Sequence, residues 1–431
     1  RYEFAAALSA TLDALQTQLA QSLETGVTPD DLRAIQRLIE AYQPEMAVVQ
    51  GRVESLEARS AVLEAQQFST TMVLNGQSTF AIANSWGGDR PGDGVSNVVF
   101  THLTQLQLAG SFQGNDAFRV GLDASNFAGR GFAEPEVLNT NMALLNYQGN
   151  TNNQINLSSL EYRFAVGDRL VFTLKPVGFG LSTVLTPNTL YGSASQGALS
   201  RFAAEPSVFK IGNLDAGVGV DWLMSDRARL QIAYGARDAG DRQQGLFSSD
   251  HRALGVQLLT RPFNNVTTGL AYINAFSANG SLDTFTGSNN ADTSGGFAER
   301  STIHALSGTL QWQITPQLTL GAWGGLTVTD SLPSDAAALS TTYQFSLGLA
   351  DPFGRKGDLL GLLVGQPLRL RYGLNIPRED EGSAMQYEAF YRFLINDHIA
   401  ITPGLFIVTE PGHISDNNTI YVGAIRTSFS F

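Results

Sequence analysis

The sequence predicts a transmembrane, antiparallel, up-and-down β-barrel of about sixteen strands, which follows an α-helical and coiled-coil N-terminal segment. Three observations support this fold class. Only 15% of the 431 residues are charged, yet mean hydropathy is close to zero. No window holds the roughly eighteen apolar residues that a membrane-spanning helix requires. After Phe68, apolar and polar residues alternate with a period of two. A sheet in lipid must close, because hydrocarbon cannot satisfy an open strand edge.

Residues 1–44 are expected to be helical. The segment is rich in Ala, Leu, Gln and Glu, and Thr28-Pro29-Asp30-Asp31 is typical of a helix N-cap and first turn after a break at Gly26. Pro44 marks a further break. Apolar residues of the first helix recur at spacings of three and four, namely Phe4, Leu8, Leu12, Leu15 and Leu19.

Residues 45–67 carry a short heptad pattern that predicts a coiled coil. Its seam consists of Met46 and Val53 at the a positions and Val49, Leu56 and Leu63 at the d positions. Three heptads are marginal for an isolated coiled coil, so we expect support from an oligomeric barrel at its C-terminal end. The alternative is an amphipathic helix that packs on its own domain.

Residues 68–431 are predicted to form the barrel. Gly, Asn, Ser and Thr separate the apolar-polar alternating segments, as expected of an all-β chain. The predicted strands span residues 71–84, 97–111, 115–127, 155–165, 169–176, 212–224, 227–237, 250–260, 265–276, 299–314, 317–329, 339–350, 358–366, 383–395, 398–408 and 418–431.

The connections between these strands alternate between short and long. Seven are tight turns, such as Gly167-Asp168 and Asn396-Asp397, and eight are longer, including 128–154 and 177–211. Even-stranded outer-membrane barrels have this asymmetry, with short periplasmic turns and long external loops.

Alternation within the strands predicts an apolar face toward lipid and a polar face toward a lumen. In 339–350, for example, Tyr343, Phe345 and Leu347 alternate with Gln344 and Ser346. A soluble β-sandwich alternates identically with its apolar face inward. The number and length of the strands favour the barrel, because most are long enough to cross a bilayer at a tilt.

The final strand ends in an aromatic pattern that resembles the signal by which outer-membrane barrels are recognised for insertion. Tyr421 and Phe429 share a face with the terminal Phe431.

Charged residues at predicted lumen positions make the expected channel wall basic. They are Arg119, Asp123, Glu161, Arg163, Arg169, Lys175, Asp221, Arg227, Arg229, Arg237, Glu388, Arg392 and Arg426. Rings of Arg with few carboxylates favour anions and discriminate by size and polarity. The alternative is that these Arg residues pair with acidic loops folded inward.

The connection 177–211 is too long for a simple cap. We expect it, or 128–154, to fold into the barrel and set the constriction, because sixteen strands otherwise leave a wide channel. Its candidate residues are Phe179, Tyr191, Arg201 and Phe202.

The sequence offers no catalytic or cofactor motif. Cysteine is absent, the five histidines show no metal-ligand spacing, and neither a Gly-x-Ser-x-Gly elbow nor a phosphate-binding loop is present. A net charge of -12 disfavours nucleic-acid binding. We therefore expect no enzyme, no metal and no cofactor.

Three segments resemble a known family. Residues 1–10, Arg-Tyr-Glu-Phe-Ala-Ala-Ala-Leu-Ser-Ala, resemble the last helix of an S-layer homology domain. Val53–Arg59 and Gln67–Gly76 resemble the coil-to-barrel junction of cyanobacterial outer-membrane porins, and the barrel resembles the carbohydrate-selective porin (OprB) family. Because the sequence begins at Arg1 without a leader, residues 1–44 would be the remnant of a longer domain and linker.

This resemblance implies a homotrimeric outer-membrane porin that passes inorganic ions and small hydrophilic solutes, with its N-terminal region in the periplasm. The missing N-terminal part would hold peptidoglycan or its linked polymers. Two alternatives stay open. The barrel could be mainly a structural anchor with a narrow or plugged lumen, or the chain could be a secreted β-rich adhesin or enzyme that is soluble without detergent.

Overall fold

The computed structural model describes residues 72–88 and 96–431, and these form one closed β-barrel. The predicted helices and the coiled-coil seam lie outside the described residues. The sixteen strands are β1 (Met72–Gly87), β2 (Val99–Gly110), β3 (Asp116–Ser125), β4 (Asn156–Val166), β5 (Leu170–Val177), β6 (Ala216–Ser225), β7 (Ala228–Ala236), β8 (His251–Phe263), β9 (Val266–Ser277), β10 (Ser301–Gln313), β11 (Leu318–Ser331), β12 (Ala337–Ala350), β13 (Leu359–Leu374), β14 (Met385–Asn396), β15 (Ile399–Thr409) and β16 (Ile420–Ser430).

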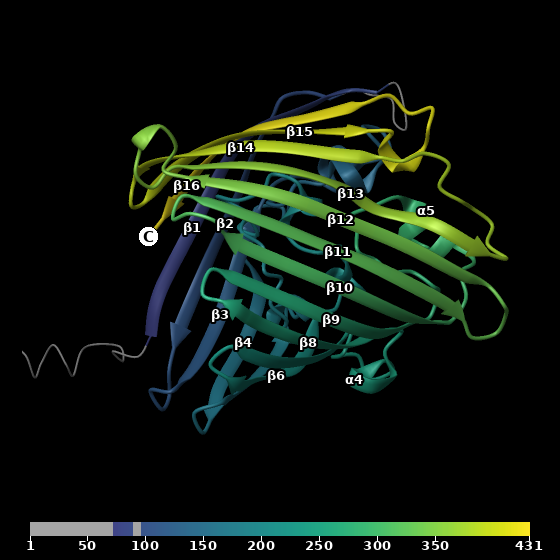
Figure 1. Cartoon of the computed structure of the whole chain (residues 1–431), viewed down its shortest axis with the longest axis horizontal. Helices are drawn as coiled ribbons and strands as arrows, with labels where there is room; N and C mark the ends of the chain where they lie inside the picture. The colour runs from purple at the N-terminus through teal and green to yellow at the C-terminus, as the bar shows by residue number, and fades with distance from the viewer. Residues whose placement is uncertain (1–71, 89–95) are drawn as a thin grey trace, which may run out of the picture. The chain divides into compact units, whose positions relative to one another are not determined.

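Every strand pairs antiparallel with its sequence neighbours, and β1 pairs with β16 to close the ring (Figure 1). The predicted fold class of the barrel, an antiparallel up-and-down arrangement of sixteen strands, is confirmed. Closure leaves no unpaired strand edge, which is the condition for a sheet to cross a bilayer. No helix among the described residues has the length and apolar character needed to span a membrane.

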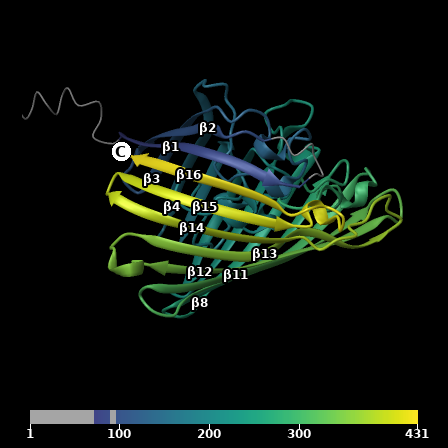
Figure 2. The ribbon, with the colours of Figure 1, turned by 90° about the horizontal axis from the view of Figure 1, so that it is seen from above.

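The C-terminal residues close the seam. Gly76 and Phe431 exchange backbone hydrogen bonds of 2.8 and 3.0 Å. Phe429 packs edge-on against Phe80 with 5.8 Å between ring centroids, and Tyr421 stacks on Trp86 at 5.9 Å. The aromatic pattern at the end of the sequence therefore stabilises the pairing of the first and last strands, which lie side by side (Figure 2).

The outer face is apolar and the inner face is polar. In β12, the side chain of Phe345 is 57% exposed, whereas that of its neighbour Gln344 is 1% exposed. The same alternation leaves Leu270 outward and Gln257 inward on neighbouring strands. A protein in water would bury Phe345 and expose Gln344, so this inverted arrangement fits a barrel surrounded by hydrocarbon.

Most predicted strand boundaries lie within four residues of those in the structure, and the largest error concerns β13, which was expected to end at 366 but continues to Leu374. Pro367 follows the expected end directly, and proline cannot donate to a strand ladder. The structure accommodates it by register shifts beside Ser340 and Tyr343 of β12, which are characteristic of a bulge.

The connections separate the barrel into a turn end and a loop end. The turn end holds the short connections, for example 226–227 and 397–398, and the loop end holds the long ones, of which 126–155, 178–215 and 278–300 are the longest. Short helices within the connections are η1 (Gly131–Ala133), η2 (Asn141–Ala143), η3 (Leu181–Thr183), α3 (Arg201–Ala204), η4 (Ser207–Lys210), α4 (Gly245–Ser248), α5 (Asn289–Asp292), η5 (Ser294–Gly296), η6 (Pro352–Gly354) and η7 (Pro411–His413).

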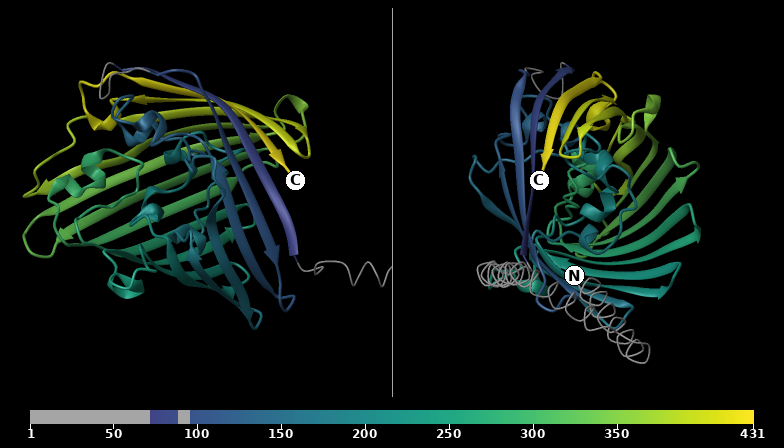
Figure 3. Two further views of the ribbon diagram at one scale, coloured as in Figure 1. Left: turned by 180° about the vertical axis from the view of Figure 1, so that it is seen from behind. Right: turned by 90° about the vertical axis from the view of Figure 1, so that its left-hand side faces the viewer.

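Several long connections fold into the barrel and fill much of its interior (Figure 3, right). They bring their own apolar side chains, and Phe209, Leu185, Tyr147 and Met142 are all at most 2% exposed. Phe209 and Leu185 cluster with small wall residues such as Ala233 and Ala253, and Tyr147 and Met142 cluster with Ala81 and Ala83. The apolar core thus lies inside the ring of strands.

Candidate constriction of the barrel lumen

A cluster of four charges occupies the inner face of β3 to β5. Glu161 lies at its centre, and its carboxylate is 2.8 Å from Arg119 Nη1, 2.9 Å from Arg163 Nε and 3.7 Å from Lys175 Nζ. The antiparallel register places Arg119 directly opposite Glu161. One carboxylate therefore faces three cations, and the cluster retains an excess of positive charge on this part of the wall.

The connection 178–215 (the crossing loop) leaves the barrel wall beside this cluster. Gly217 and Gly235 make room for its first aromatic residue, because a Cβ atom at either position would lie 2.5 Å from the ring of Phe179. Arg163 Nη2 then donates to Thr183 O at 2.7 Å. The same wall charges that line the lumen therefore also hold the start of this loop.

Two wall amides hold the crossing loop at Thr186. The backbone N–H of Thr186 donates to Gln231 Oε1 at 3.0 Å and to Gln257 Oε1 at 2.7 Å. Gln257 Nε2 donates back to Thr186 O at 2.9 Å. Further along, Asn188 Nδ2 donates to Thr267 O at 3.0 Å. The loop thus follows the inner wall from β4 to β9 through hydrogen bonds that each join a side chain to a backbone group.

The crossing loop then reaches the opposite wall. Glu388 on β14, eight positions from β6 in the ring of sixteen, accepts from the Leu199 N–H, from the Ser200 N–H at 3.3 Å and from Ser200 Oγ at 2.5 Å. Arg426 on β16 donates to Ala194 O at 2.7 Å and Gly197 O at 2.5 Å. Glu388 and Arg426 thus form a clamp that holds residues 194–200 on the wall opposite the start of the loop.

The candidate aromatic residues of the crossing loop pack onto the wall. Tyr191 is 1% exposed and meets Phe390 edge-on at 5.3 Å. Phe202 is 3% exposed and meets Trp323 edge-on at 5.4 Å. These rings therefore act as anchors of the loop, whereas Arg201 between them is half-buried and borders open space.

The remaining charged candidates occupy several separate places. Asp221 pairs with Arg229, and Asp123 accepts from Ser158 Oγ at 2.8 Å. Arg237 pairs with Asp283 of the inward-folded connection 278–300 at 2.5 Å. Arg392 donates to Gly357 O at 3.1 Å near the turn end. Arg169 and Arg227 lie in the turns before β5 and β7 and are exposed.

Two polar cavities adjoin the crossing loop inside the barrel. The first, of about 410 Å³, lies between the loop and Lys175 on β5, and the second, of about 390 Å³, lies between the loop and the connection 126–155. Arg201 and Asn213 line both cavities. Openings of this size suit small molecules. Arg201 thus lies where the two cavities adjoin, and this region is the candidate constriction.

Three charged residues of this region were not among the predicted site residues, namely Arg130, Glu205 and Lys210. They belong to the two connections that were named as constriction candidates, so counting the charges of these loops would have found them. Lys210 donates to Arg201 O and Glu205 O, both at 3.2 Å, and is 3.5 Å from the Glu205 carboxylate. Burial lowers the pKa of Lys210 to about 8.

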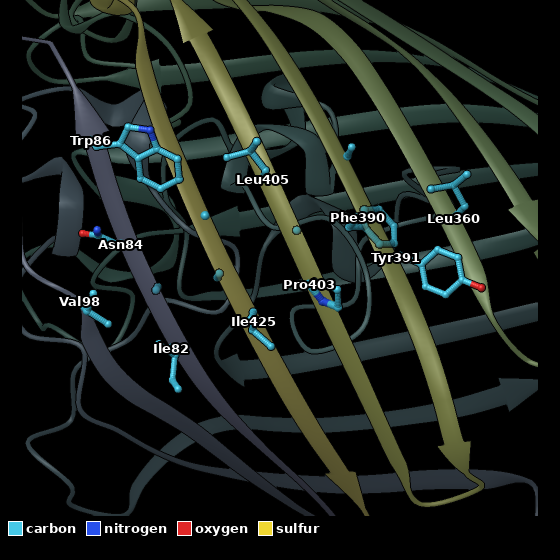
Figure 4. A pocket seen from close by; sticks show the side chains of 15 residues that line it. Ile82, Asn84, Trp86, Val98, Leu360, Phe390, Tyr391, Pro403, Leu405 and Ile425 are labelled. Carbon is cyan, nitrogen blue, oxygen red and sulfur yellow. The ribbon is translucent and has the colours of Figure 1, made fainter.

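A further hollow, of about 600 Å³, lies on the outer face over β1 and β13 to β16 (Figure 4). Its lining is apolar apart from Asn84, and includes Trp86, Pro403, Leu405 and Ile425. A surface of this kind suits contact with hydrocarbon and not the passage of polar solutes. The internal cavities are therefore the candidate solute path.

Within the described residues, no group of three or more His, Asp or Glu side chains is arranged to hold a metal ion.

In a comparison with known protein families, residues 30–431 match the family described as carbohydrate-selective porin, OprB family. An uncharacterized protein of Synechocystis sp. is 32% identical over the whole chain and 82% of its own length, and one of Nostoc sp. is 31% identical over the whole chain and 78% of its own length. Among solved structures, Pseudomonas putida OprB matches 87% of this chain and 96% of its own, with a TM-score of 0.60 and 11% identity. Vibrio cholerae OmpT lacking loop L8 matches 84% of this chain and 100% of its own, with a TM-score of 0.52 and 7% identity. Both structures share the barrel fold.

Proposed function

Because the chain belongs to the carbohydrate-selective porin OprB family and forms a closed outer-membrane barrel, we propose that it is a passive channel for inorganic ions and small hydrophilic solutes. The observation that carries this proposal is the crossing loop, which is clamped on both walls and leaves two polar cavities beside Arg201. A loop fixed in this way narrows the lumen to the size of small solutes without a moving part. The turn end faces the periplasm and the loop end faces outward.

The charge of the constriction favours anions. Lys175, Arg201, Lys210 and Arg130 line the two cavities, and Glu205 is the one carboxylate that does so among the described residues. Charges in a narrow, low-dielectric passage act strongly on the ions that enter it. We expect small anions to pass more readily than cations of similar size.

Planar-bilayer recording tests this proposal. The purified barrel should conduct in KCl, and the reversal potential in a KCl gradient should show preference for chloride. Deleting residues 181–203, which removes most of the crossing loop but not the wall, should raise single-channel conductance. Unchanged conductance in the deletion variant would remove the loop as the constriction, and a clear preference for potassium would contradict the basic lumen. Swelling of proteoliposomes in solutions of neutral sugars measures carbohydrate passage separately.

A second candidate function is a structural anchor with a plugged barrel. The apolar packing of the inward-folded connections favours it, since Phe209, Leu185 and Tyr147 fill part of the lumen. A plugged barrel would give no ion current in the same bilayer experiment.

We further propose that barrels assemble as trimers and that the N-terminal region, in the periplasm, tethers them to peptidoglycan or its linked polymers. The resemblance of residues 1–10 and of the coil-to-barrel junction supports both parts. Mass measurement of the detergent-solubilised protein tests the trimer, and co-sedimentation of the purified protein with purified cell wall tests the tether.

A further inference from the structure

Arg201 lies at the meeting point of the two internal cavities. Its backbone is fixed, because its N–H donates to Leu144 O at 2.8 Å and the preceding Ser200 caps α3 by accepting from the Ala203 N–H at 3.2 Å. Ser200 is itself held by Glu388. The guanidinium therefore projects from a rigid point of the crossing loop into the solute path.

The side chain of Arg201 forms no hydrogen bond and no direct ion pair with the described residues. Its Nε is buried without a hydrogen bond. Across residues 72–88 and 96–431, its guanidinium makes neither a hydrogen bond nor an ion pair within 4 Å. A buried charge of this kind is costly unless something pairs with it. The polar cavities on either side are the places from which such a partner can come.

The carboxylates nearest to Arg201 are occupied by other groups. Glu205 pairs with Lys210. Asp292 accepts from Thr284 Oγ1 at 2.6 Å and from the backbone N–H groups of Thr284 and Phe285 at 2.9 and 2.7 Å. Both carboxylates act on Arg201 through space, but neither forms an ion pair with it within 4 Å. The lining of the two cavities keeps an excess of cations.

We propose that Arg201 binds a small oxyanion of phosphate chemistry inside the constriction. This inference rests on the proposed channel function and deepens it by naming a preferred solute class. A guanidinium matches two oxygens of phosphate with a planar fork of N–H donors. Lys210 and Lys175 supply further positive charge at the walls of the adjoining cavity. A neutral sugar gains nothing from net charge, whereas an oxyanion is favoured by the four cations that line the two cavities, in the described part of the chain, against the single carboxylate of Glu205.

The test uses inorganic phosphate. Calorimetric titration of the detergent-solubilised barrel measures phosphate binding whether or not the channel conducts. The Arg201→Gln variant should weaken this binding by about ten-fold or more, because a hydrogen bond to a charged group contributes at least a ten-fold change in affinity. Arg201→Lys keeps the positive charge but loses the planar fork of N–H donors, so its phosphate affinity should lie between those of the natural protein and Arg201→Gln. Arg242→Gln removes an exposed charge of the 237–250 connection and should bind as the natural protein does.

Bilayer recording gives the second readout. Phosphate added to KCl at constant ionic strength should reduce the chloride current in a saturating way, and Arg201→Gln should shift the half-blocking concentration in the same proportion as the calorimetric affinity. If the natural protein conducts but binds phosphate no better than Arg201→Gln does, the oxyanion site is overturned and the channel proposal still stands. A barrel that binds phosphate through Arg201 but passes no current would instead overturn the channel proposal. Heat-modifiable migration on gels verifies that each variant is folded.

Discussion

Replacing Glu388 by Gln tests whether the clamp on β14 holds the crossing loop in place. The natural carboxylate accepts three hydrogen bonds, from the N–H groups of Leu199 and Ser200 and from Ser200 Oγ. The side chain is 4% exposed, so water cannot readily replace it. An amide keeps the shape but turns one acceptor oxygen into a donor, which then faces another donor.

The expected cost is that of at least one hydrogen bond to a charged group, about 1.5–3 kcal/mol. At about 1.4 kcal/mol for each factor of ten, release of residues 194–200 from the wall becomes roughly ten- to a hundred-fold more frequent. The strand ladders are unaffected, because only the side chain of Glu388 changes. The barrel should therefore stay folded while its constriction becomes unstable.

Single-channel recording measures this effect. Glu388→Gln should show higher mean conductance and more open-channel noise than the natural protein. Glu381→Gln is the matched control, since Glu381 is exposed and lies outside the crossing loop. Traces of Glu388→Gln that match those of the natural protein and of the control would refute the role of the clamp.

Three further predictions follow from the same geometry. Because the pKa of Lys210 is about 8, its amine is charged at pH 7 and largely neutral at pH 9. The preference for chloride over potassium in a KCl gradient should therefore fall as the pH rises from 7 to 9. The Lys210→Gln variant should lose this pH dependence. Gly217→Leu should displace the ring of Phe179 and lower the unfolding temperature, at an overpacking cost of about 1–3 kcal/mol. Gly308→Ala should leave the unfolding temperature unchanged, because open space surrounds Gly308. Heat-modifiable migration on gels measures the unfolding temperature of both variants. Phe431→Ala should reduce the amount of assembled barrel in the outer membrane, because the ring covers Gly76 at the seam, and unchanged levels would contradict this.

Alternation along the chain predicted the strands, and the number and length of these strands then decided for a closed barrel with its apolar face outward. A strand in a bilayer obeys a local rule. Residues two apart share a face, and the face toward lipid must be apolar. The same rule placed Arg119, Glu161 and Lys175 together on the inner wall. The crossing loop was predicted from its length, although its path was not.

Only the tertiary structure separated the inner charges by role. Glu388 and Arg426 obey the same alternation as Arg119 and Lys175, yet they hold the crossing loop, whereas Arg201 on that loop borders the two internal cavities. The partners of Glu388 lie nearly two hundred positions away in sequence. No local pattern encodes such contacts, because they depend on where a loop without periodicity folds inside a closed ring.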